Sequence, residues 1–422
     1  MARKMKDSGI EWIGEIPEEW SKNKVIRLFD IIGSGTTPKN ITSDFPVVNW
    51  IQSGDITGSF MPTCKNVISA NLLSQYSALK VYPAPFIIIA MYGASVGNAS
   101  ISLIDGCVNQ ACCVLSSPSC NLHYAFYVIK SAQSYLVRKA VGGGQPNISQ
   151  ETIKQLWLPL PPLSTQDIIV RNLDATCSKI DDLLSSVHAS IEEYKKLKQA
   201  VITQAVTKGV RGEREMKDSG VEWIGKVPSK WNCIKIKYLF EIRKRIAGKE
   251  GYTVLSITQT GIKPKNISSN EGQLADSYSN YQLLHFGEFA MNHMDLLTGW
   301  VDISNYNGVT SPDYRVFSLK DTITNHPRYF LYLMQMCYFN RIFYSMAQGV
   351  SSLGRWRLQS DKFLNCIFPV PSIEEQKEIS AYLDTTCSEI DKLIAKKEQL
   401  VKELESYKKS LIYEVVTGKR EV

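Results

Sequence analysis

Two stretches of the chain carry apolar residues at alternating steps of four and three, the spacing that forms one face of a coiled-coil helix. Lys198 interrupts the first stripe, and Lys397 and Lys408 interrupt the second. Each stretch follows a proline-rich segment and runs for about 40 residues, which predicts helices roughly 60 Å long. The predicted coiled-coil core consists of Leu173, Cys177, Ile180, Leu184, Val187, Ile191, Leu383, Cys387, Ile390, Ile394, Val401 and Leu404.

A single amphipathic helix cannot bury such a stripe, and the chain supplies one partner for each helix. We therefore expect the two helices to pair within the chain. The connection between them is long enough for either direction. We favour an antiparallel pair, because a pseudo-twofold arrangement makes the two halves of the chain equivalent.

The halves are also related by sequence. Residues 5–20 (MKDSGIEWIGEIPEEW) return at 216–231 as MKDSGVEWIGKVPSKW, with eleven of sixteen positions identical. PLPPLSTQ, from Pro159, returns as PVPSIEEQ from Pro369. Between these blocks the halves differ almost completely. The pattern predicts a common scaffold that carries two unlike inserts.

The inserts contain short β-rich runs separated by Gly, Ser, Asn and Pro, such as 46–51, 86–90, 252–257 and 314–319. Helical patterns follow toward the end of each insert, at 122–141 and 327–347. We therefore predict an α+β protein: two mixed α/β domains separated by two long helices that form an antiparallel intramolecular coiled coil, in a pseudo-twofold tandem repeat. The predicted boundaries are 1–160 and 213–368 for the domains, and 161–212 and 369–422 for the helices.

Charge is concentrated in the inserts. The whole chain carries a net charge of +7. Residues 21–160 hold ten bases and five acids, and residues 232–365 hold fifteen bases and ten acids, so each insert carries +5 and the remainder −3. A basic excess in the two variable parts indicates a polyanionic partner. The chain shows neither a membrane-spanning apolar run nor a secretory signal, so we expect it in the cytoplasm.

Motifs for catalysis are weak. Gly33-Ser34-Gly35 is followed by Thr-Thr-Pro rather than a helix, and Gly349–Gly354 lacks the Lys-Ser/Thr of a phosphate loop. The nuclease-like Glu193-Tyr194-Lys195 lies within a predicted coiled-coil helix. The ten cysteines form no CxxC, and a lone His293 near Asp295 is more often structural. We predict no catalytic residues and no metal site.

The inserts do contain loops suited to DNA, with flexible glycines beside amides, hydroxyls and cations that can bond base edges or phosphates. Each loop alone is more often a solvated turn. Their recurrence near the start and end of both inserts favours nucleic acid. The predicted DNA-binding residues are Ser34, Thr36, Thr37, Lys39, Asn40, Gly143, Gln145, Asn147, Arg243, Lys244, Arg245, Lys263, Lys265, Gln348, Ser351, Ser352, Arg355 and Arg357.

The whole chain resembles the specificity subunits of type I restriction–modification systems. The resemblance is carried by SGIEWIGEIPEEW and its copy SGVEWIGKVPSKW, by PLPPLSTQ and PVPSIEEQ before the long helices, and by the insert segments FPVVNWIQSGDIT, IIIAMYGASVGNASI and GVTSPDYRVF. It implies two target-recognition domains, each reading one half of an asymmetric, bipartite DNA target with a fixed spacer.

The resemblance also implies a non-catalytic subunit. Two methyltransferase subunits would hold S-adenosylmethionine for adenine methylation, and motor–nuclease subunits would use ATP and Mg²⁺ for cleavage. The chain itself would bind double-stranded DNA, with no membrane partner. The alternative is a two-headed DNA-binding or scaffold protein without modification partners. Trp12, Trp20, Trp223 and Trp231 would either help to dock the partners or anchor the repeated segments to their own inserts.

Overall fold

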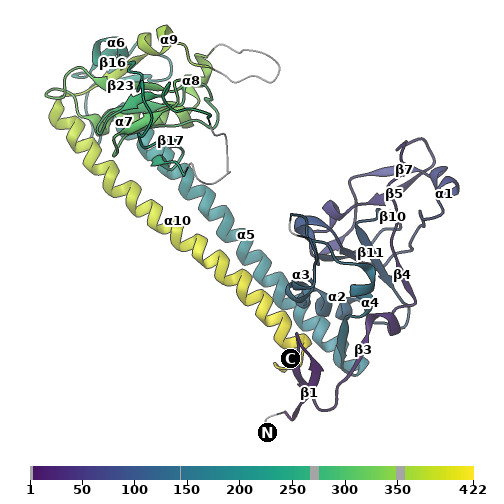
Figure 1. Ribbon diagram of the computed structural model, residues 1–422. Coiled ribbons are helices and arrows are strands. Elements are labelled where there is room, and N and C mark those ends of the chain that lie inside the picture. Colours follow the sequence, from purple (N-terminus) through teal and green to yellow (C-terminus); the bar gives the residue numbers. More distant parts are fainter. Residues whose placement is uncertain (1–2, 143, 267–274, 348–356) are drawn as a thin grey trace. The chain divides into compact units, whose positions relative to one another are not determined.

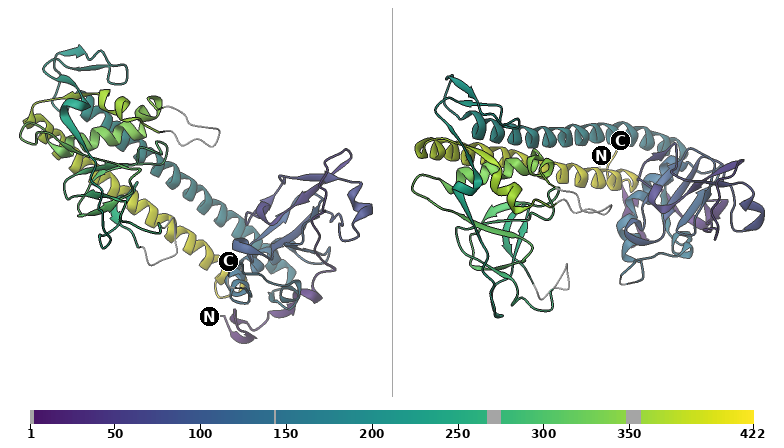
Figure 2. Two further views of the ribbon diagram at one scale, coloured as in Figure 1. Left: turned by 45° about the horizontal axis from the view of Figure 1, so that its top comes forward. Right: turned by 90° about the horizontal axis from the view of Figure 1, so that it is seen from above.

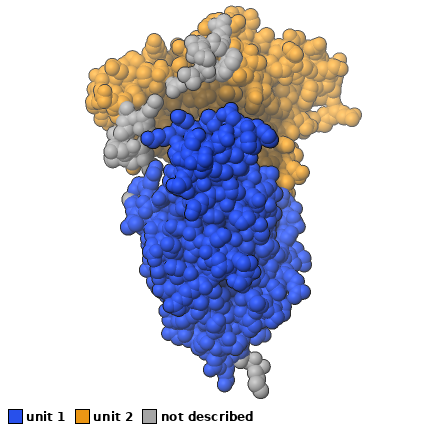
Figure 3. Space-filling view, turned by 90° about the vertical axis from the view of Figure 1, so that its right-hand side faces the viewer, with its two compact units in different colours: residues 1–187, 399–422 blue, residues 188–398 orange. Residues whose placement is uncertain are grey.

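The computed structural model describes residues 3–142, 144–266, 275–347 and 357–422. The chain divides into two compact units (Figures 1 and 3). Unit 1 comprises residues 1–187 and 399–422, and unit 2 comprises residues 188–398. Each unit therefore contains one insert together with parts of both long helices. No helix in the described ranges is long and apolar enough to cross a bilayer.

Unit 1 is built on a five-stranded sheet with the order β4-β11-β8-β9-β6, in which only the β6–β9 pair is parallel. A second sheet has the order β10-β5-β7, and β1–β2 and β3–β12 form antiparallel pairs. The strands are β1 (Met5–Ile10), β2 (Gly14–Pro17), β3 (Ser21–Lys24), β4 (Ile31–Gly33), β5 (Val47–Ile51), β6 (Phe60–Met61), β7 (Val67–Ser69), β8 (Phe86–Ala90), β9 (Ala99–Ser102), β10 (Cys107–Val108), β11 (Cys112–Ser116) and β12 (Trp157–Leu160). The α-helices are α1 (Leu72–Gln75), α2 (Leu122–Ser131), α3 (Gln133–Arg138), α4 (Gln150–Lys154) and the first part of α5 (Leu163–Lys208).

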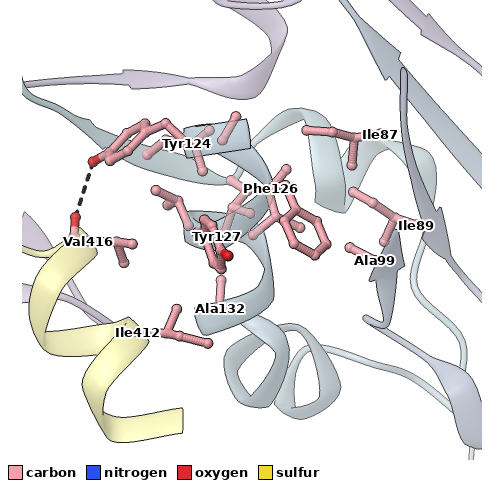
Figure 4. Packing of buried hydrophobic residues seen from close by; sticks show 14 of the residues in the cluster. Ile87, Ile89, Ala99, Tyr124, Phe126, Tyr127, Ala132, Ile412 and Val416 are labelled. Atoms are coloured by element: carbon pink, nitrogen blue, oxygen red, sulfur yellow. Dashed lines mark hydrogen bonds between the residues drawn. The ribbon is translucent and has the colours of Figure 1, made fainter. Parts of the chain in front are cut away.

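The central strand β8 explains the layering of unit 1. All five of its residues are buried, because alternate side chains enter different cores on the two faces of the sheet. Ile87 and Ile89 pack with α2 in one core, as Figure 4 shows, whereas Phe86 and Ile88 belong to the other. Asn121 caps α2 by accepting a hydrogen bond from the Tyr124 amide at 3.0 Å.

Unit 2 repeats this frame. Its main sheet has the order β16-β23-β20-β21, which matches β4-β11-β8-β9, and β13–β14 and β15–β24 match the antiparallel pairs of unit 1. Two further antiparallel pairs are the β17–β18 hairpin and β19–β22. The strands are β13 (Met216–Asp218), β14 (Lys226–Pro228), β15 (Asn232–Lys235), β16 (Phe240–Arg243), β17 (Leu255–Thr258), β18 (Gly261–Pro264), β19 (Gln282–Leu284), β20 (Phe289–Met291), β21 (Val301–Ile303), β22 (Gly308–Thr310), β23 (Arg315–Leu319) and β24 (Ile367–Val370). The α-helices are α6 (Ile236–Leu239), α7 (Pro327–Phe339), α8 (Ile342–Ser345), α9 (Ser360–Asn365) and α10 (Ile373–Val416).

The two long helices pair in opposite directions, which confirms the predicted antiparallel coiled coil. In unit 1 the start of α5 lies beside the end of α10, and in unit 2 the end of α5 lies beside the start of α10 (Figures 1 and 2). The lysines that interrupt the stripes make contacts between the helices. Lys408 pairs with Asp181 at 2.5 Å in unit 1, and its repeat equivalent Lys198 pairs with Asp391 at 2.6 Å in unit 2. Lys397 lies 5.6 Å from the ring centre of Tyr194.

All twelve predicted stripe residues are buried or half-buried. The stripe is covered most completely near the domains, where Leu173 and Leu383 are fully buried. Toward the middle of each helix the burial becomes partial, as at Val187 and Ile394. Burial of the stripe thus depends on the domains as well as on the partner helix.

Each domain also binds the end of the helix that belongs to the other half of the sequence. In unit 1 the Tyr124 hydroxyl lies 3.1 Å from the carbonyl of Val416, near the end of α10 (Figure 4). In unit 2 the Tyr329 hydroxyl lies 3.2 Å from the carbonyl of Val206, near the end of α5. Both tyrosines are buried, and burial raises their pKa values well above 10, so they remain neutral hydroxyls. The halves are therefore interlocked in a reciprocal way.

The repeated segments 5–20 and 216–231 contain the antiparallel pairs β1–β2 and β13–β14, and their tryptophans lie in the domain cores. Trp12, Trp20 and Trp231 are buried, while the half-buried Trp223 packs edge-on against Phe368. This arrangement favours anchoring of each repeated segment to its own domain, the second of the two interpretations that the sequence left open.

The anchor is stronger in unit 2. The buried Glu375 accepts hydrogen bonds from the Trp231 indole at 3.0 Å and from Arg214 at 2.5 Å. At the matching position unit 1 has Thr165, and the buried Trp20 indole nitrogen finds no partner among the described residues. Unit 2 therefore joins its hairpin to the start of α10 through a charged network that unit 1 lacks.

We predict that Glu375→Thr, which installs the residue found in the first half, lowers the free energy of unfolding by about 2 kcal/mol, because it strands a partly buried guanidinium and a buried indole nitrogen. Chemical denaturation of the full chain measures the change. The control is Glu378→Ala, which removes the exposed ion pair with Arg211 and should leave the free energy of unfolding nearly unchanged. Equal losses in the two variants would show that the Glu375 network adds nothing beyond a surface pair.

Candidate nucleic-acid interface

In unit 1 the predicted loop near the start of the insert, residues 33–40, packs against the start of β11 and is referred to as the early loop. The Ser34 hydroxyl donates to the Cys112 carbonyl at 2.7 Å, and Thr37 donates to the Gln110 side chain at 2.7 Å. A Cβ on Gly35 would lie 1.7 Å from the Val108 carbonyl oxygen. Close backbone approach, rather than the flexibility that the sequence suggested, therefore requires glycine here.

The predicted loop near the end of the same insert, residues 141–149, is referred to as the late loop, and it is hydrogen-bonded to the residues just after β8. The Ile148 amide donates to the Met91 carbonyl at 2.9 Å, and the Gly93 amide donates to the Pro146 carbonyl at 2.9 Å. The Met91 amide in turn donates to the Ala111 carbonyl at 2.8 Å, just before β11 begins. Both predicted recognition loops consequently meet at one end of the main sheet.

Several polar side chains at this end face solvent. Of the residues predicted from the sequence, Ser34 and Thr36 are half-buried, and Gly143 lies outside the described residues. The exposed ones are Thr37, Lys39, Asn40, Gln145 and Asn147. Tyr92, an aromatic residue after β8 that the sequence analysis did not select, is 45% exposed and is bridged to Asn147. An exposed aromatic ring beside an amide suits stacking and hydrogen bonding to nucleic acid.

The matching end of the unit 2 sheet is more cationic. There β16 ends at Arg243, β23 begins at Arg315, and β20 ends at Met291, with Met291 opposite Arg315 in register. Arg357 lies near this end of the sheet, because the amide of the next residue, Leu358, donates to the His293 carbonyl at 2.9 Å. The side chain of Arg357 is exposed. The strand-end arrangement of unit 1 thus returns with different chemistry.

Ion pairs distinguish the predicted cations of unit 2. Arg243 pairs with Glu241 at 3.0 Å, and Arg245 pairs with Glu288. Within the described ranges, Lys244, Lys263 and Arg357 form no salt bridge. Lys263 and Lys265 belong to or follow the β17–β18 hairpin, which is separate from the main sheet. Gln348, Ser351, Ser352 and Arg355 lie outside the described residues.

Two buried residues lie behind this surface: Arg315, which sequence reasoning missed, and His293, which it interpreted as structural. Arg315 is 4% exposed and His293 is 6% exposed. Burial, and then the nearby charges of Arg315 and Arg357, lower the pKa of His293 to about 3. Burial is also the main cause that lowers the pKa of Arg315 to about 10. His293 is therefore neutral near pH 7, whereas Arg315 remains a cation. Arg315 lies within the quoted segment GVTSPDYRVF, but the neighbouring residues in the sequence give no sign that its charged side chain is buried.

Comparison with known proteins fits this arrangement. The profile of the family described as "Type I restriction modification DNA specificity domain" matches residues 17–193 and 228–403. Together these ranges cover most of the chain. The chain belongs to this family. The earlier resemblance to type I specificity subunits is thereby confirmed, and each matched range spans one insert and ends within the long helix that follows it.

Two curated specificity subunits illustrate the distance to relatives. The type I restriction enzyme MjaVIII specificity subunit of Methanocaldococcus jannaschii is 25% identical over 310 residues, which are 70% of this chain and 69% of that protein. The EcoBI specificity subunit of Escherichia coli is 21% identical over 399 residues, covering 86% and 82% of the two chains.

Solved structures support the same fold. A chain from a study of complex assembly and conformational transition in a type I restriction–modification system matches with a TM-score of 0.70 at 13% identity, covering 95% of this chain and 98% of that one. The HsdS subunit from Thermoanaerobacter tengcongensis matches with a TM-score of 0.51 at 14% identity, covering 96% and 98%. At this identity the likeness concerns the fold alone.

The specificity domain of unit 2 should be sensitive to acid through His293. Below its ordinary pKa of 6.5 an unfolded histidine binds a proton, whereas the buried one does not do so until about pH 3. Stability contributed by the neutral ring is therefore complete above pH 6.5 and is lost as the pH falls toward 3. We predict that wild-type protein loses up to about 1.4 kcal/mol per pH unit more than His293→Gln across this window.

Urea denaturation at several pH values between 7.5 and 4 measures this difference. His188→Gln, on the exposed surface of α5 in the same unit, serves as the matched control and should follow the wild type. Parallel pH profiles for wild type and His293→Gln would contradict the buried, neutral histidine.

Proposed function

We propose that this chain is the non-catalytic, sequence-specific DNA-binding subunit of a type I restriction–modification complex. The observation that carries the proposal is that one repeated frame brings two unlike sets of loops to the same end of its main sheet. Loops with Thr37, Gln145 and Asn147 in unit 1 would read one half-site, and the cationic surface around Arg357 in unit 2 would read the other. Because the two sets of side chains differ, the target is asymmetric and bipartite.

The long helices would set the spacer. α5 contributes residues to both compact units, and so does α10. We infer recognition domains at 1–160 and 213–368, with spacer helices at 161–212 and 369–422. Half-site centres would lie on the order of one turn of DNA, about 34 Å, apart.

Partner subunits would supply the chemistry, in the cytoplasm. In the described residues no cluster of three or more His, Cys, Asp or Glu side chains could hold a metal ion. We propose that two methyltransferase subunits bind S-adenosylmethionine and methylate adenine, and that motor–nuclease subunits use ATP and Mg²⁺ for cleavage. This chain would place both activities on the target by binding double-stranded DNA.

The surface of the long helices supports docking of two like partners. Beside the buried stripe, α10 exposes a second apolar series at heptad spacing, Leu393, Leu400 and Tyr407, which are 41%, 41% and 46% exposed. α5 exposes Leu183 and Leu197, the repeat equivalents of Leu393 and Tyr407, at 53% and 48%. Apolar residues that recur at equivalent places on both helices suit two copies of one partner.

We predict that deleting this chain abolishes adenine methylation at one gapped, two-part sequence motif in the genome. Single-molecule sequencing of DNA from cells with and without the chain measures the methylated fraction, which should fall from near complete to background. Methylation at other motifs in the same cells is the internal control. A motif that persists after deletion, or a palindromic one, would contradict the proposal; loss of no motif would instead favour a two-headed DNA-binding or scaffold protein without modification partners.

We predict that the exposed helix positions decide partner stoichiometry. Leu183→Asp or Leu393→Asp alone should leave about one methyltransferase subunit per chain in co-purification, and the double variant about none, because each apolar series would hold one partner. Lys402→Asp, on the other side of α10 from Leu393, is the control and should retain both. Unfolding free energies should change by no more than about 0.5 kcal/mol, since both leucines are exposed. Retention of both partners by the double variant would place the docking surface elsewhere.

A further inference from the structure

Arg315 is a buried cation without a carboxylate partner among the described residues. Its side chain lies between Met291, whose sulfur is 3.6 Å from Nη1, and the ring of Phe363, whose centre is 4.7 Å from the guanidinium carbon. A buried charge is expensive unless hydrogen bonds compensate for the lost water. The partners of its remaining donors therefore indicate what this residue does.

Those partners lie in one short segment. Nη2 donates to the Leu358 carbonyl at 2.9 Å and to the Ser360 hydroxyl at 3.2 Å. The Leu358 amide donates to the His293 carbonyl at 2.9 Å, and the Leu358 side chain is fully buried. The backbone of Leu358 is thus held on one side by β23 and on the other by the residue that follows β20 by two positions. Arg357 immediately precedes this fixed point, and its side chain is exposed.

Stability alone does not account for an arginine at this position. An apolar side chain of similar length would fill the space between Met291 and Phe363 without the cost of removing a charge from water. What an apolar residue could not do is donate hydrogen bonds to Leu358 and Ser360. The feature specific to arginine is therefore the placement of this segment.

Unit 1 solves the same problem differently. One step beyond the Ala90–Cys112 pair in its main sheet are Met91 and Ala111, whose backbones bond directly at 2.8 Å. There the late loop is held through the Met91 carbonyl, which accepts from the Ile148 amide at 2.9 Å. Unit 1 thus has Ala111 at the position where unit 2 has Arg315. Among the described residues, only unit 2 therefore holds its late segment through an arginine side chain from the main sheet.

We infer that Arg315 is a positioning residue for DNA recognition. It fixes the Leu358 backbone from within the sheet and thereby sets the position and direction of Arg357, at the end of the main sheet of unit 2 where β20 ends and β23 begins. This inference rests on the proposed function. It assigns Arg315 no contact with DNA, because its side chain is buried. Removing the guanidinium would leave the fold intact but let Arg357 vary in position, so discrimination would weaken at one half-site only.

The test uses the full chain assembled with its methyltransferase subunits. Competition binding compares three duplexes: the two-part motif mapped by methylation sequencing, the same duplex with one half-site replaced, and the same duplex with the other half-site replaced. For Arg315→Met we expect discrimination against one replaced half-site to fall about tenfold while that against the other is unchanged. The melting temperature should change little, because the hydrogen bonds lost to Leu358 and Ser360 are offset by removal of a charge that is costly to bury. Arg315→Lys, which retains the charge but not the two-pronged geometry, should fall between Met and wild type.

Two further variants make the test specific. Arg357→Ala should weaken the same half-site, and adding Arg315→Met to it should cause little further loss, because both changes act through one side chain. Lys320→Met, which removes an exposed cation just beyond the other end of β23, is the matched control and should change neither half-site.

The inference would be overturned if Arg315→Met lowered affinity equally for all three duplexes, or if it left both half-sites unchanged. A loss of discrimination that appeared only together with a lowered melting temperature would also overturn it in favour of a purely structural role. If the wild-type complex itself did not prefer the mapped motif, the proposed function would fail instead, and the two failures are distinguishable by that wild-type measurement.

Discussion

An apolar stripe along a long helix must be covered, and in this chain each half of the sequence covers the stripe of the other. Leu173 and Cys177 at the start of α5 share a core with Leu411 and Val415 at the end of α10. Ile202 and Val206 share the second core with Leu383 and Cys387 in the same way. Because neither insert completes its own hydrophobic core, the antiparallel direction is a requirement of folding. The hydroxyls of Tyr124 and Tyr329 reinforce it by binding the helix end that arrives from the other half.

This reciprocity constrains the frame and leaves the surfaces free to differ. Positions that close the core keep their chemistry in both units, as with Tyr127 and Tyr332, whose hydroxyls bind Asp174 and Asp384 at 2.6 Å. Positions at the strand ends do not, since an alanine before β11 corresponds to Arg315 of β23. A frame that tolerates different residues at one place in each copy is what recognition of two different sequences requires.

The sequence predicted those parts of the fold that depend on local periodicity or on repetition. The coiled-coil stripes, the strand at 86–90 and the helices near 122–141 and 327–347 all follow from such patterns, and the structure has β8, α2, α3, α7 and α8 in these places. It could not identify the role of Arg315, because that role depends on Leu358, which lies 43 residues beyond Arg315 in the chain. The sequence also could not show that Arg243 and Arg245 are paired with carboxylates, one of which comes from Glu288 across the sheet.

The candidate interface of unit 2 consequently presents fewer uncompensated cations than the composition of the insert indicates. The insert carries a net +5, but ion pairs compensate Arg243 and Arg245, and the lowered pKa of His293 removes a further possible cation. Arg357 is left exposed, immediately before the Leu358 backbone that the buried Arg315 binds. A few cations that are both uncompensated and fixed in direction can discriminate between base pairs, whereas a diffuse positive surface would attract any duplex equally.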